Sequence, residues 1–252
     1  MYTEFAELYD ELMNDVDYVA WAEQYASLMS LYGQKSGNVC ECACGTGSLT
    51  LCLQEMGYHM TGVDLSQDML FRASEKARKA GRMVPFVRQD MRCLQLHRPM
   101  DAVLATCDGV NYLLTQKDLK AFFTHAWQAL KPGGCLIFDV STPYKLEHIL
   151  GDRMLMEDTE RITYVWQNHY EKRTRLVDMQ LCFFVREPDG RYRRIDEEQT
   201  QAAHTQEELT ECLSACGFDA IRFFAEHGTG APDAHAERWH IAARKVGKEE
   251  KA

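Results

Sequence analysis

The stretch "VCECACGTGSLT", residues 39–50, joins a short apolar segment to a turn with two glycines and then to the start of a helix. Residues 38–43 have the composition of a buried strand, and residues 48–56 have the pattern of a helix. Gly45 and Gly47 fall in the connection, where glycine lets the backbone turn tightly and approach a ligand closely. The stretch therefore predicts a βαβ unit whose first turn faces a bound molecule.

The same alternation of strand and helix continues along the chain. Strands are predicted at 58–64, 83–90, 100–108 and 135–140, and helices at 66–81 and 116–134. Short apolar strands separated by helices are typical of a mostly parallel, doubly wound sheet with helices on both faces. We expect an α/β fold.

The segments on either side of this core have different patterns. Residues 1–35 predict two amphipathic helices and an N-terminal helical cap, and 36–141 the cofactor-binding core. Residues 142–200 alternate with period two around the turn "EPDGR", which predicts an antiparallel β insertion. We expect this insertion to act as a lid. Residues 201–252 return to the α/β core, with a helix capped by Thr205 and Glu208, two more strands and a frayed tail "GKEEKA".

Cys40, Cys42 and Cys44 alternate along the predicted strand, which raises the question of a thiolate metal site. Zinc sites usually pair C-x₂₋₄-C with a second, distant pair, and the chain has no such partner. Within a strand covered on both faces, cysteine behaves as a small apolar residue. We predict that these cysteines are core residues and that no metal is bound. The pair Cys212 and Cys216 has the same interpretation.

Charge and hydropathy narrow the function classes. The chain has 252 residues and a net charge of −10, with seven acidic residues and no Lys or Arg before Lys35. Binding to the nucleic-acid backbone needs a positively charged surface, so the net negative charge argues against a nucleic-acid partner. No apolar run is long enough to span a bilayer, and the N-terminus does not resemble a signal peptide. We expect a cytoplasmic protein without a membrane partner, whose oligomeric state the sequence leaves open.

The sequence of the glycine turn distinguishes between several classes of nucleotide-binding site. A P-loop needs Lys-Ser/Thr after its last glycine, and a dinucleotide fingerprint needs a third glycine where this chain has Thr50. Asp64 follows the second predicted strand, 17 residues after Gly47. A carboxylate at that edge of the sheet can accept hydrogen bonds from both ribose hydroxyls of an adenosine. A plain helix-terminal role for Asp64 is the alternative, although Ser66 already supplies an N-cap.

Taken together, "CECACGTGSLT", "TGVDLSQDML", "VRQDM" and "LKPGGCLIFDV" resemble the class I S-adenosylmethionine-dependent methyltransferases. The resemblance extends over the whole chain and is nearest to amino-sugar N-methyltransferases, glycine N-methyltransferase-like enzymes and uncharacterised bacterial relatives. It implies a seven-stranded, Rossmann-like sheet and S-adenosylmethionine as cofactor, with S-adenosylhomocysteine as product. Glu41 departs from the family, where many members have Asp.

The resemblance also implies residue roles. Glu41, Ala43 and Gly45 would face the methionine part of the cofactor, and Gly47 belongs to the same turn. The remaining cofactor contacts are expected from the ribose side (Asp64, Leu65, Met69), the adenine side (Asp90, Met91), the floor beneath the sulfonium (Thr106, Cys107) and a lid (Tyr9). The alternative for Tyr9 and Met69 is a plain apolar position on the face of their helices.

We expect methyl transfer to a small-molecule acceptor, with a nitrogen as the methylated atom. Methyl transfer from a sulfonium asks mainly for alignment, although an amine acceptor benefits from a nearby base or hydrogen-bond acceptor. The candidates are Asp108, Asn111, Tyr112 and His204. The alternatives are a tRNA or protein methyltransferase, an oxidoreductase on the same fold, which the missing third glycine disfavours, and a non-enzymatic cofactor-binding regulator.

Overall fold

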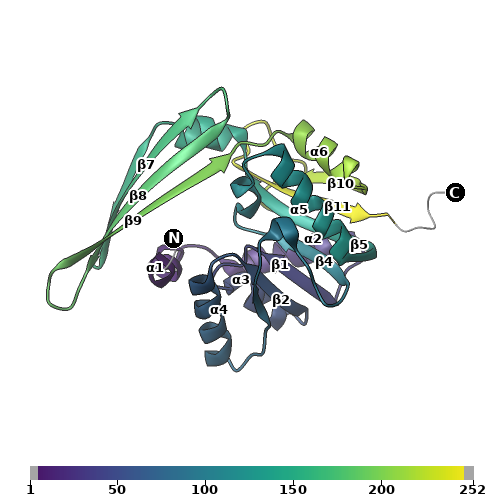
Figure 1. Ribbon diagram of the computed structural model, residues 1–252, viewed down its shortest axis with the longest axis horizontal. Helices are drawn as coiled ribbons and strands as arrows, with labels where there is room; N and C mark the ends of the chain where they lie inside the picture. The colour runs from purple at the N-terminus through teal and green to yellow at the C-terminus, as the bar shows by residue number, and fades with distance from the viewer. Residues whose placement is uncertain (1–4, 247–252) are drawn as a thin grey trace.

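The computed structural model describes residues 5–246 and contains two β-sheets (Figure 1). The larger sheet has seven strands in the order β10-β11-β5-β4-β1-β2-β3, and the smaller has four in the order β6-β7-β8-β9. In the larger sheet β11 is the reversed strand, antiparallel to β10 on one side and to β5 on the other, and the remaining pairs are parallel. The expected α/β architecture, with its Rossmann-like sheet, helical cap and antiparallel insertion, is confirmed.

The five parallel strands are β1 (Asn38–Cys42), β2 (His59–Asp64), β3 (Phe86–Arg88), β4 (Met100–Ala105) and β5 (Leu130–Ser141). β10 (Phe218–Phe224) and β11 (Arg238–Lys245) complete the sheet. Because β1 lies between β2 and β4, the turn after β1 occupies the middle of the sheet's carboxyl edge. Ligands of doubly wound sheets bind at this position.

Helices cover both faces of the sheet, and successive side chains along each strand point to opposite faces. Cys40 and Cys42 point toward the face packed by α5 (Gln116–Ala129) and α6 (Gln206–Ala215). Val39 points toward α2 (Tyr18–Leu31) and α3 (Ser48–Glu55). Cys40 and Cys42 are fully buried, so the interpretation of these thiols as core residues is confirmed.

Local sequence signals account for the helix ends. α4 (Gln67–Lys79) begins after Ser66, whose hydroxyl accepts a hydrogen bond from the Met69 backbone. α6 begins with the expected capping box of Thr205 and Glu208, which satisfies two otherwise unpaired backbone N–H groups. Within residues 5–246, no helix has both the length and the apolar character needed to cross a membrane.

The insertion is a long antiparallel sheet that extends past the core (Figure 1). Its strands are β6 (Met154–Asp158), β7 (Ile162–Glu171), β8 (Leu176–Arg186) and β9 (Tyr192–Ala202), and a π-helical turn, η3 (Lys145–Leu150), precedes it. The sequence pattern did not indicate β6 or η3. The "EPDGR" hairpin turn does join β8 to β9, with the Glu187 backbone N–H donating to the Arg191 carbonyl.

Both ends of the insertion are anchored. Near its base, Val177 and Met179 pack on Leu146 and Leu150 of η3. At its far end, an apolar cluster joins the insertion to α1 (Phe5–Leu12) and α4; its buried members are Phe5, Ala6, Leu8, Met69, Ile162, Phe183, Val185 and Ile195. The insertion therefore contacts the core at η3 and again through α1 and α4, and α1 lies between it and α4 (Figure 1).

Candidate functional site

The turn after β1 has an unusual backbone. Ala43, Gly45 and Gly47 all adopt left-handed conformations, with φ of 53°, 52° and 72°. A Cβ on Gly47 would lie 3.0 Å from the Phe86 ring, so this position requires glycine. A Cβ on Gly45 would meet only the Tyr9 ring, at 4.0 Å, so the turn leaves space between this backbone and α1. Non-glycine residues in this conformation concentrate at functional sites.

Asp64 ties this turn to the start of α4. One carboxylate oxygen accepts a hydrogen bond from the Gly45 backbone (2.8 Å), and the other accepts from the Ser66 backbone (2.8 Å). Burial raises the pKa of Asp64, and the backbone donors of Ser66, Gly45 and Leu65 oppose that shift. A carboxylate has about four acceptor positions, so Asp64 can still accept a hydrogen bond from a diol. Leu65 beside it is largely exposed, whereas Met69 is buried in the cluster that joins α1 and the insertion.

Glu41 is a deeply buried acid at this edge of the sheet. Its two oxygens accept hydrogen bonds from the hydroxyls of Thr106 (2.7 Å) and Thr50. Burial raises the pKa of Glu41 to about 7, against the lowering effect of the two hydroxyls. Within residues 5–246 no ion pair involves this carboxylate. A buried, uncompensated carboxyl group suits a cationic ligand group.

A small cavity of about 20 Å³, near the size of one water molecule, lies beside Glu41. Tyr9 from α1, Tyr18 from α2, the β1 turn, Thr106 and Cys107 line it. The Tyr9 ring packs edge-on against Phe5 at 5.7 Å, and burial raises the pKa of its hydroxyl. Thus the structure brings Tyr9, Glu41, Ala43, Gly45, Thr106 and Cys107 together around one space.

The turn after β4 is held by a buried charge cluster. Cys107 and Asp108 are both left-handed, with φ of 53° and 61°. The Arg238 guanidinium forms ion pairs with both Asp108 and Asp139. Asp139 also accepts hydrogen bonds from the Tyr25 hydroxyl (2.6 Å) and the Asp108 backbone (3.1 Å). Burial would raise the pKa of Asp108, but Arg238 holds it below its usual value. Asp108 therefore stays ionised and paired.

Sequence reasoning missed Arg238, Asp139 and Tyr25. Arg238 begins β11 and Asp139 lies in β5, so both looked like ordinary strand residues. A signal was present, because Asp139 interrupts the apolar strand "CLIFDV" and a fully buried acid requires a partner. That Arg238, about 100 residues later, supplies the partner depends on the pairing of β11 with β5, in which Arg238 opposes Ser141.

Asn111 and Tyr112, two of the acceptor-site candidates, differ in availability. Asn111 is fully buried; its amide donates to the carbonyls of Ser141 (3.0 Å) and Ala202 (2.9 Å), and its oxygen accepts from the Ser141 backbone (2.9 Å). These bonds use both of its donors, so Asn111 clamps the β4 turn to β5 and β9 and has no donor left for an acceptor. Tyr112 is half-exposed and its hydroxyl donates to Gln199 of the insertion (2.7 Å).

His204 lies at the exit of the insertion and is buried beneath the β4 turn. Burial lowers its pKa, although the carbonyls of Val110 and Leu113 and the charge of Glu208 oppose the shift. Its Nε2 has no hydrogen-bond partner within residues 5–246. Its burial beside the backbone of Val110 and Leu113 favours a structural role over the acceptor-site role expected from its position in the chain.

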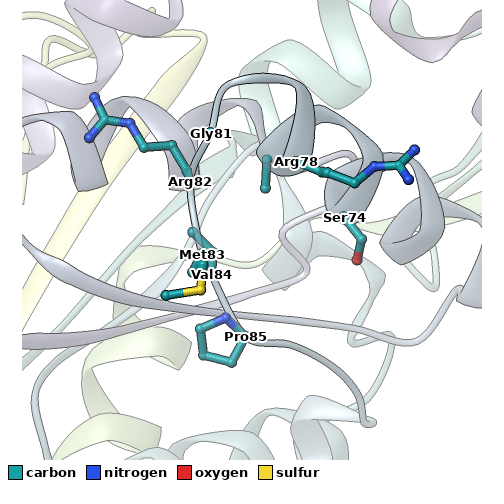
Figure 2. A pocket seen from close by; sticks show the side chains of 8 residues that line it. Ser74, Arg78, Gly81, Arg82, Met83, Val84 and Pro85 are labelled. Atoms are coloured by element: carbon teal, nitrogen blue, oxygen red, sulfur yellow. The ribbon is translucent and has the colours of Figure 1, made fainter.

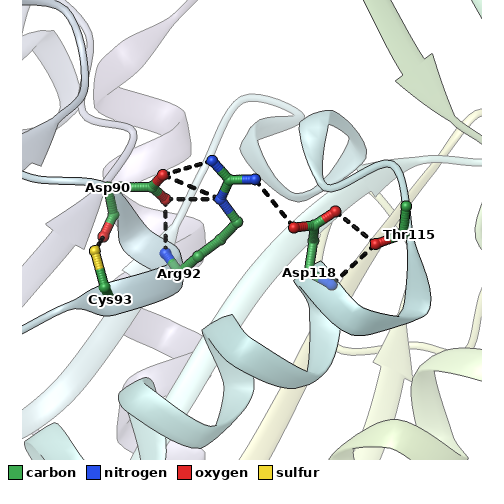
Figure 3. Close-up of polar contacts among 5 residues, drawn as sticks. All are labelled: Asp90, Arg92, Cys93, Thr115 and Asp118. Atoms are coloured by element: carbon green, nitrogen blue, oxygen red, sulfur yellow. Dashed lines mark hydrogen bonds and ion pairs between the residues drawn. The ribbon is translucent and has the colours of Figure 1, made fainter.

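Asp90 and Met91, the expected adenine contacts, follow β3. Asp90 forms a bidentate ion pair with Arg92, with its closest N–O distance at 2.6 Å, and Arg92 also reaches Asp118 at 3.0 Å (Figure 3). Hydrogen bonding from Arg92 lowers the pKa of Asp90. Met91 is partly buried against the apolar core. The Asp90 carboxylate is therefore already paired with the Arg92 guanidinium, a partner that the sequence analysis did not predict.

Another cavity lies away from this site. It measures about 570 Å³ and is formed by the end of α4 and the segment before β3, including Arg78, Arg82 and Met83 (Figure 2). The two guanidinium groups point away from each other (Figure 2). This cavity is at the far end of α4 from Asp64, so it does not belong to the site at the β1 turn. Within residues 5–246, no three His, Cys, Asp or Glu side chains are arranged to hold a metal ion.

The residues at the sheet's carboxyl edge form a donor set with two distinct ends. Glu41 presents an uncompensated carboxyl group at one end, and Asp64 presents spare lone pairs at the other, with the open face of Gly45 between them. S-adenosylmethionine carries an ammonium at one end and a ribose diol near its middle. The residues present therefore fit this cofactor.

Comparisons with known proteins agree with that fit. A family model described as "Methyltransferase domain" matches residues 39–134. YqeM of Bacillus subtilis (strain 168), whose name places it among the methyltransferases, is 34% identical over 246 residues, covering 97% of each chain. An N,N-dimethyltransferase of Streptomyces venezuelae, named for dTDP-3-amino-3,4,6-trideoxy-alpha-D-glucopyranose, is 27% identical over 218 residues, covering 84% of this chain and 89% of its own.

The fold comparison points the same way. The crystal structure of an S-adenosylmethionine-dependent methyltransferase from Clostridium acetobutylicum ATCC 824 superposes with a TM-score of 0.88. It is 31% identical in sequence, and the match covers 98% of this chain and 99% of that one. The chain therefore belongs to the S-adenosylmethionine-dependent methyltransferases, and S-adenosylmethionine is its methyl donor.

Proposed function

We propose that this enzyme methylates a nitrogen atom of a small-molecule acceptor. The observation that carries the proposal is the insertion, which is anchored at both ends and crosses the carboxyl edge of the sheet. The hydrogen bond between Tyr112 and Gln199 joins the β4 turn to the insertion at this point. A site roofed in this way suits a small acceptor better than a folded RNA. The Streptomyces relative, named for a dTDP-amino sugar, supports nitrogen as the methylated atom.

The proposed cofactor contacts follow from the donor set. Glu41 would meet the ammonium of the methionine part, beside the backbone of Ala43 and Gly45, and Asp64 would accept hydrogen bonds from the ribose. We assign the other contacts to Gly47 and Leu65 around the ribose, Asp90 and Met91 at the adenine, and Thr106, Cys107 and Tyr9 around the sulfur. Met69 would support this region by holding α1 and the insertion together.

When bound, S-adenosylmethionine supplies a methyl group on a positively charged sulfur. The protein's contribution is to hold the acceptor nitrogen in line with that methyl group and to exclude water. Alignment of this kind corresponds to an effective molarity of roughly 10⁵–10⁸ M. The nitrogen lone pair forms the new N–C bond as the C–S bond breaks, and the product nitrogen then loses a proton.

Asp108 is our candidate for orienting the acceptor amine. Its carboxylate stays ionised beside Arg238 and remains partly accessible, with 22% of the side chain exposed. A carboxylate whose pKa is lowered accepts a hydrogen bond well but takes up a proton poorly. We therefore assign Asp108 an orienting role, and we expect solvent to receive the proton from the product.

A transfer assay with isotope-labelled S-adenosylmethionine tests the proposal. Purified enzyme is incubated with a panel of primary and secondary amines, including nucleotide-linked amino sugars, and with matched alcohols, bulk tRNA and bulk protein. We expect label to move to one or more small amines and not to their alcohol analogues. Transfer to tRNA or protein alone would replace the proposal with the macromolecular alternative, and an absence of transfer to every class would favour a cofactor-binding regulator.

A further inference from the structure

Glu41 differs from Asp64 in the kind of hydrogen-bond partners that it has. Asp64 accepts from two backbone N–H groups, which can only donate and therefore favour the ionised carboxylate. Glu41 is bonded to the hydroxyls of Thr50 and Thr106. A hydroxyl can donate to a carboxylate or accept from a carboxylic acid, so it suits both protonation states. The site of Glu41 is thus built to accommodate a change of protonation.

The surroundings of Glu41 favour its protonated form. Burial is the largest influence, and Asp64 and Asp139 add to it as like charges. Burial raises the pKa of Tyr18, Cys44 and Cys107, so these groups remain neutral near pH 7. The titratable groups facing Glu41 come from α2 (Tyr18), β1 and its turn (Cys42, Cys44), α3 (Cys52), β2 (Asp64), β4 (Cys107) and β5 (Asp139). None of these groups is a cation.

We propose that Glu41 holds a proton when the site is without cofactor and releases it when the cofactor's α-ammonium binds, so that Glu41 selects ligands carrying a free ammonium. This inference rests on the proposed placement of the methionine end beside Glu41. The proton passes from the Glu41 carboxyl to solvent, and the resulting carboxylate pairs with the ammonium. A ligand that has the adenosine and the thioether but no amino acid leaves the proton in place.

The magnitude follows from the pKa of Glu41, which burial raises to about 7. At pH 6.5, binding releases roughly 0.8 proton if the carboxyl is fully ionised in the complex. Between pH 6.0 and pH 7.5, the affinity then rises about eightfold, because less of the empty protein must lose a proton in order to bind. Binding strengthens as pH rises, because the carboxyl group must be ionised in the complex.

Isothermal titration calorimetry tests the proposal with two probes. S-adenosylhomocysteine carries the α-ammonium, whereas 5′-methylthioadenosine has the same nucleoside and a thioether without the amino acid. Both are titrated into the wild-type protein, Glu41→Gln and the control Glu211→Gln, an exposed residue on α6. Titrations at pH 6.5 in phosphate and in imidazole, which differ in ionisation enthalpy, give the number of protons released. Because both ligands contain the ribose, any titration of Asp64 cancels in the ratio of their affinities.

We expect wild type and Glu211→Gln to release about 0.8 proton with S-adenosylhomocysteine and none with 5′-methylthioadenosine. The ratio of the two affinities should rise about eightfold from pH 6.0 to pH 7.5, and in Glu41→Gln it should not change with pH. S-adenosylhomocysteine that binds without proton release overturns the inference and leaves the proposed function standing. Proton release that persists in Glu41→Gln assigns the proton elsewhere and also overturns it. Should neither ligand bind the wild type, the proposed cofactor placement itself fails.

Discussion

Replacing Arg238 with methionine tests whether the buried charge cluster holds the β4 turn. Methionine keeps much of the side-chain volume and removes the guanidinium. Asp139 is fully buried and would keep only the Tyr25 hydroxyl and the Asp108 backbone as partners, while Asp108 would lose its ion pair. Breaking a buried ion pair by removing one partner costs about 3–5 kcal/mol. We expect the free energy of unfolding to fall by that amount at pH 7.5.

The pH dependence of this effect distinguishes lost charge from lost packing. In the wild type, Arg238 holds the pKa of Asp108 below its unfolded value, so this contribution to stability is present above that value and disappears as pH falls through the lower, folded pKa. In Arg238→Met, burial raises the pKa of Asp108, and the carboxyl becomes protonated well before the wild-type group does. The difference in stability should therefore shrink between pH 7.5 and pH 5.

Urea denaturation followed by circular dichroism measures both effects, with Arg244→Met as the matched control. Arg244 lies on the same strand and pairs with Asp219, and both side chains are 40% exposed. An exposed pair contributes about 0–1 kcal/mol. The reasoning is refuted if Arg238→Met loses no more stability than Arg244→Met, or if its loss is independent of pH.

Three further changes address the turn, the clamp and the cofactor. Gly47→Ala places a Cβ 3.0 Å from Phe86 at a φ of 72°, so we expect a loss of about 1–3 kcal/mol in urea denaturation, and a variant as stable as the wild type would show that the turn tolerates a side chain. Asn111→Ala leaves buried backbone groups of Ser141 and Ala202 unpaired and should cost about 3 kcal/mol without creating an acceptor-specific defect. Asp64→Ala should weaken S-adenosylhomocysteine at least tenfold in calorimetry, since a charge-assisted hydrogen bond contributes about 1.5–3 kcal/mol; unchanged affinity in a folded variant would reduce Asp64 to a helix-end residue.

Local patterns were sufficient to predict much of the fold. The alternation of apolar segments with capped helices predicted the strands and α-helices of the α/β core, and Ser66 and Thr205 marked helix starts that the structure contains. The helix expected over 116–134 ends at Ala129, because residues 130–134 already belong to β5. The short 3-10 helices at Met91–Cys93 and Gly109–Tyr112 were not predicted. The β6 strand and the η3 turn escaped prediction because their residues have neither period two over a sufficient length nor a full helical period. Their conformations depend on packing with β7 and the core.

The part of the site that is formed by residues close in sequence could be predicted. The β1 turn and Asp64 lie close in sequence, and their contact follows from the adjacency of β1 and β2. Whether the candidate side chains are free to bind an acceptor could not be predicted. Asn111 and Asp108 looked equivalent in "CDGVNY", yet Asn111 is saturated by backbone groups of β5 and β9, and Asp108 is paired with Arg238 from the last strand. Such partners are set by long-range strand order.

A crystal structure of the protein with S-adenosylhomocysteine tests the central claim most directly. Our account predicts that the ligand lies along the carboxyl edge of the sheet, with its ammonium beside Glu41 and its ribose hydroxyls on Asp64. The sulfur should face the Cys107–Asp108 turn and open toward the inner face of the insertion, where the acceptor would bind. Density for the ligand at the Arg78 and Arg82 cavity, or a sulfur directed away from the insertion toward open solvent, would contradict the account.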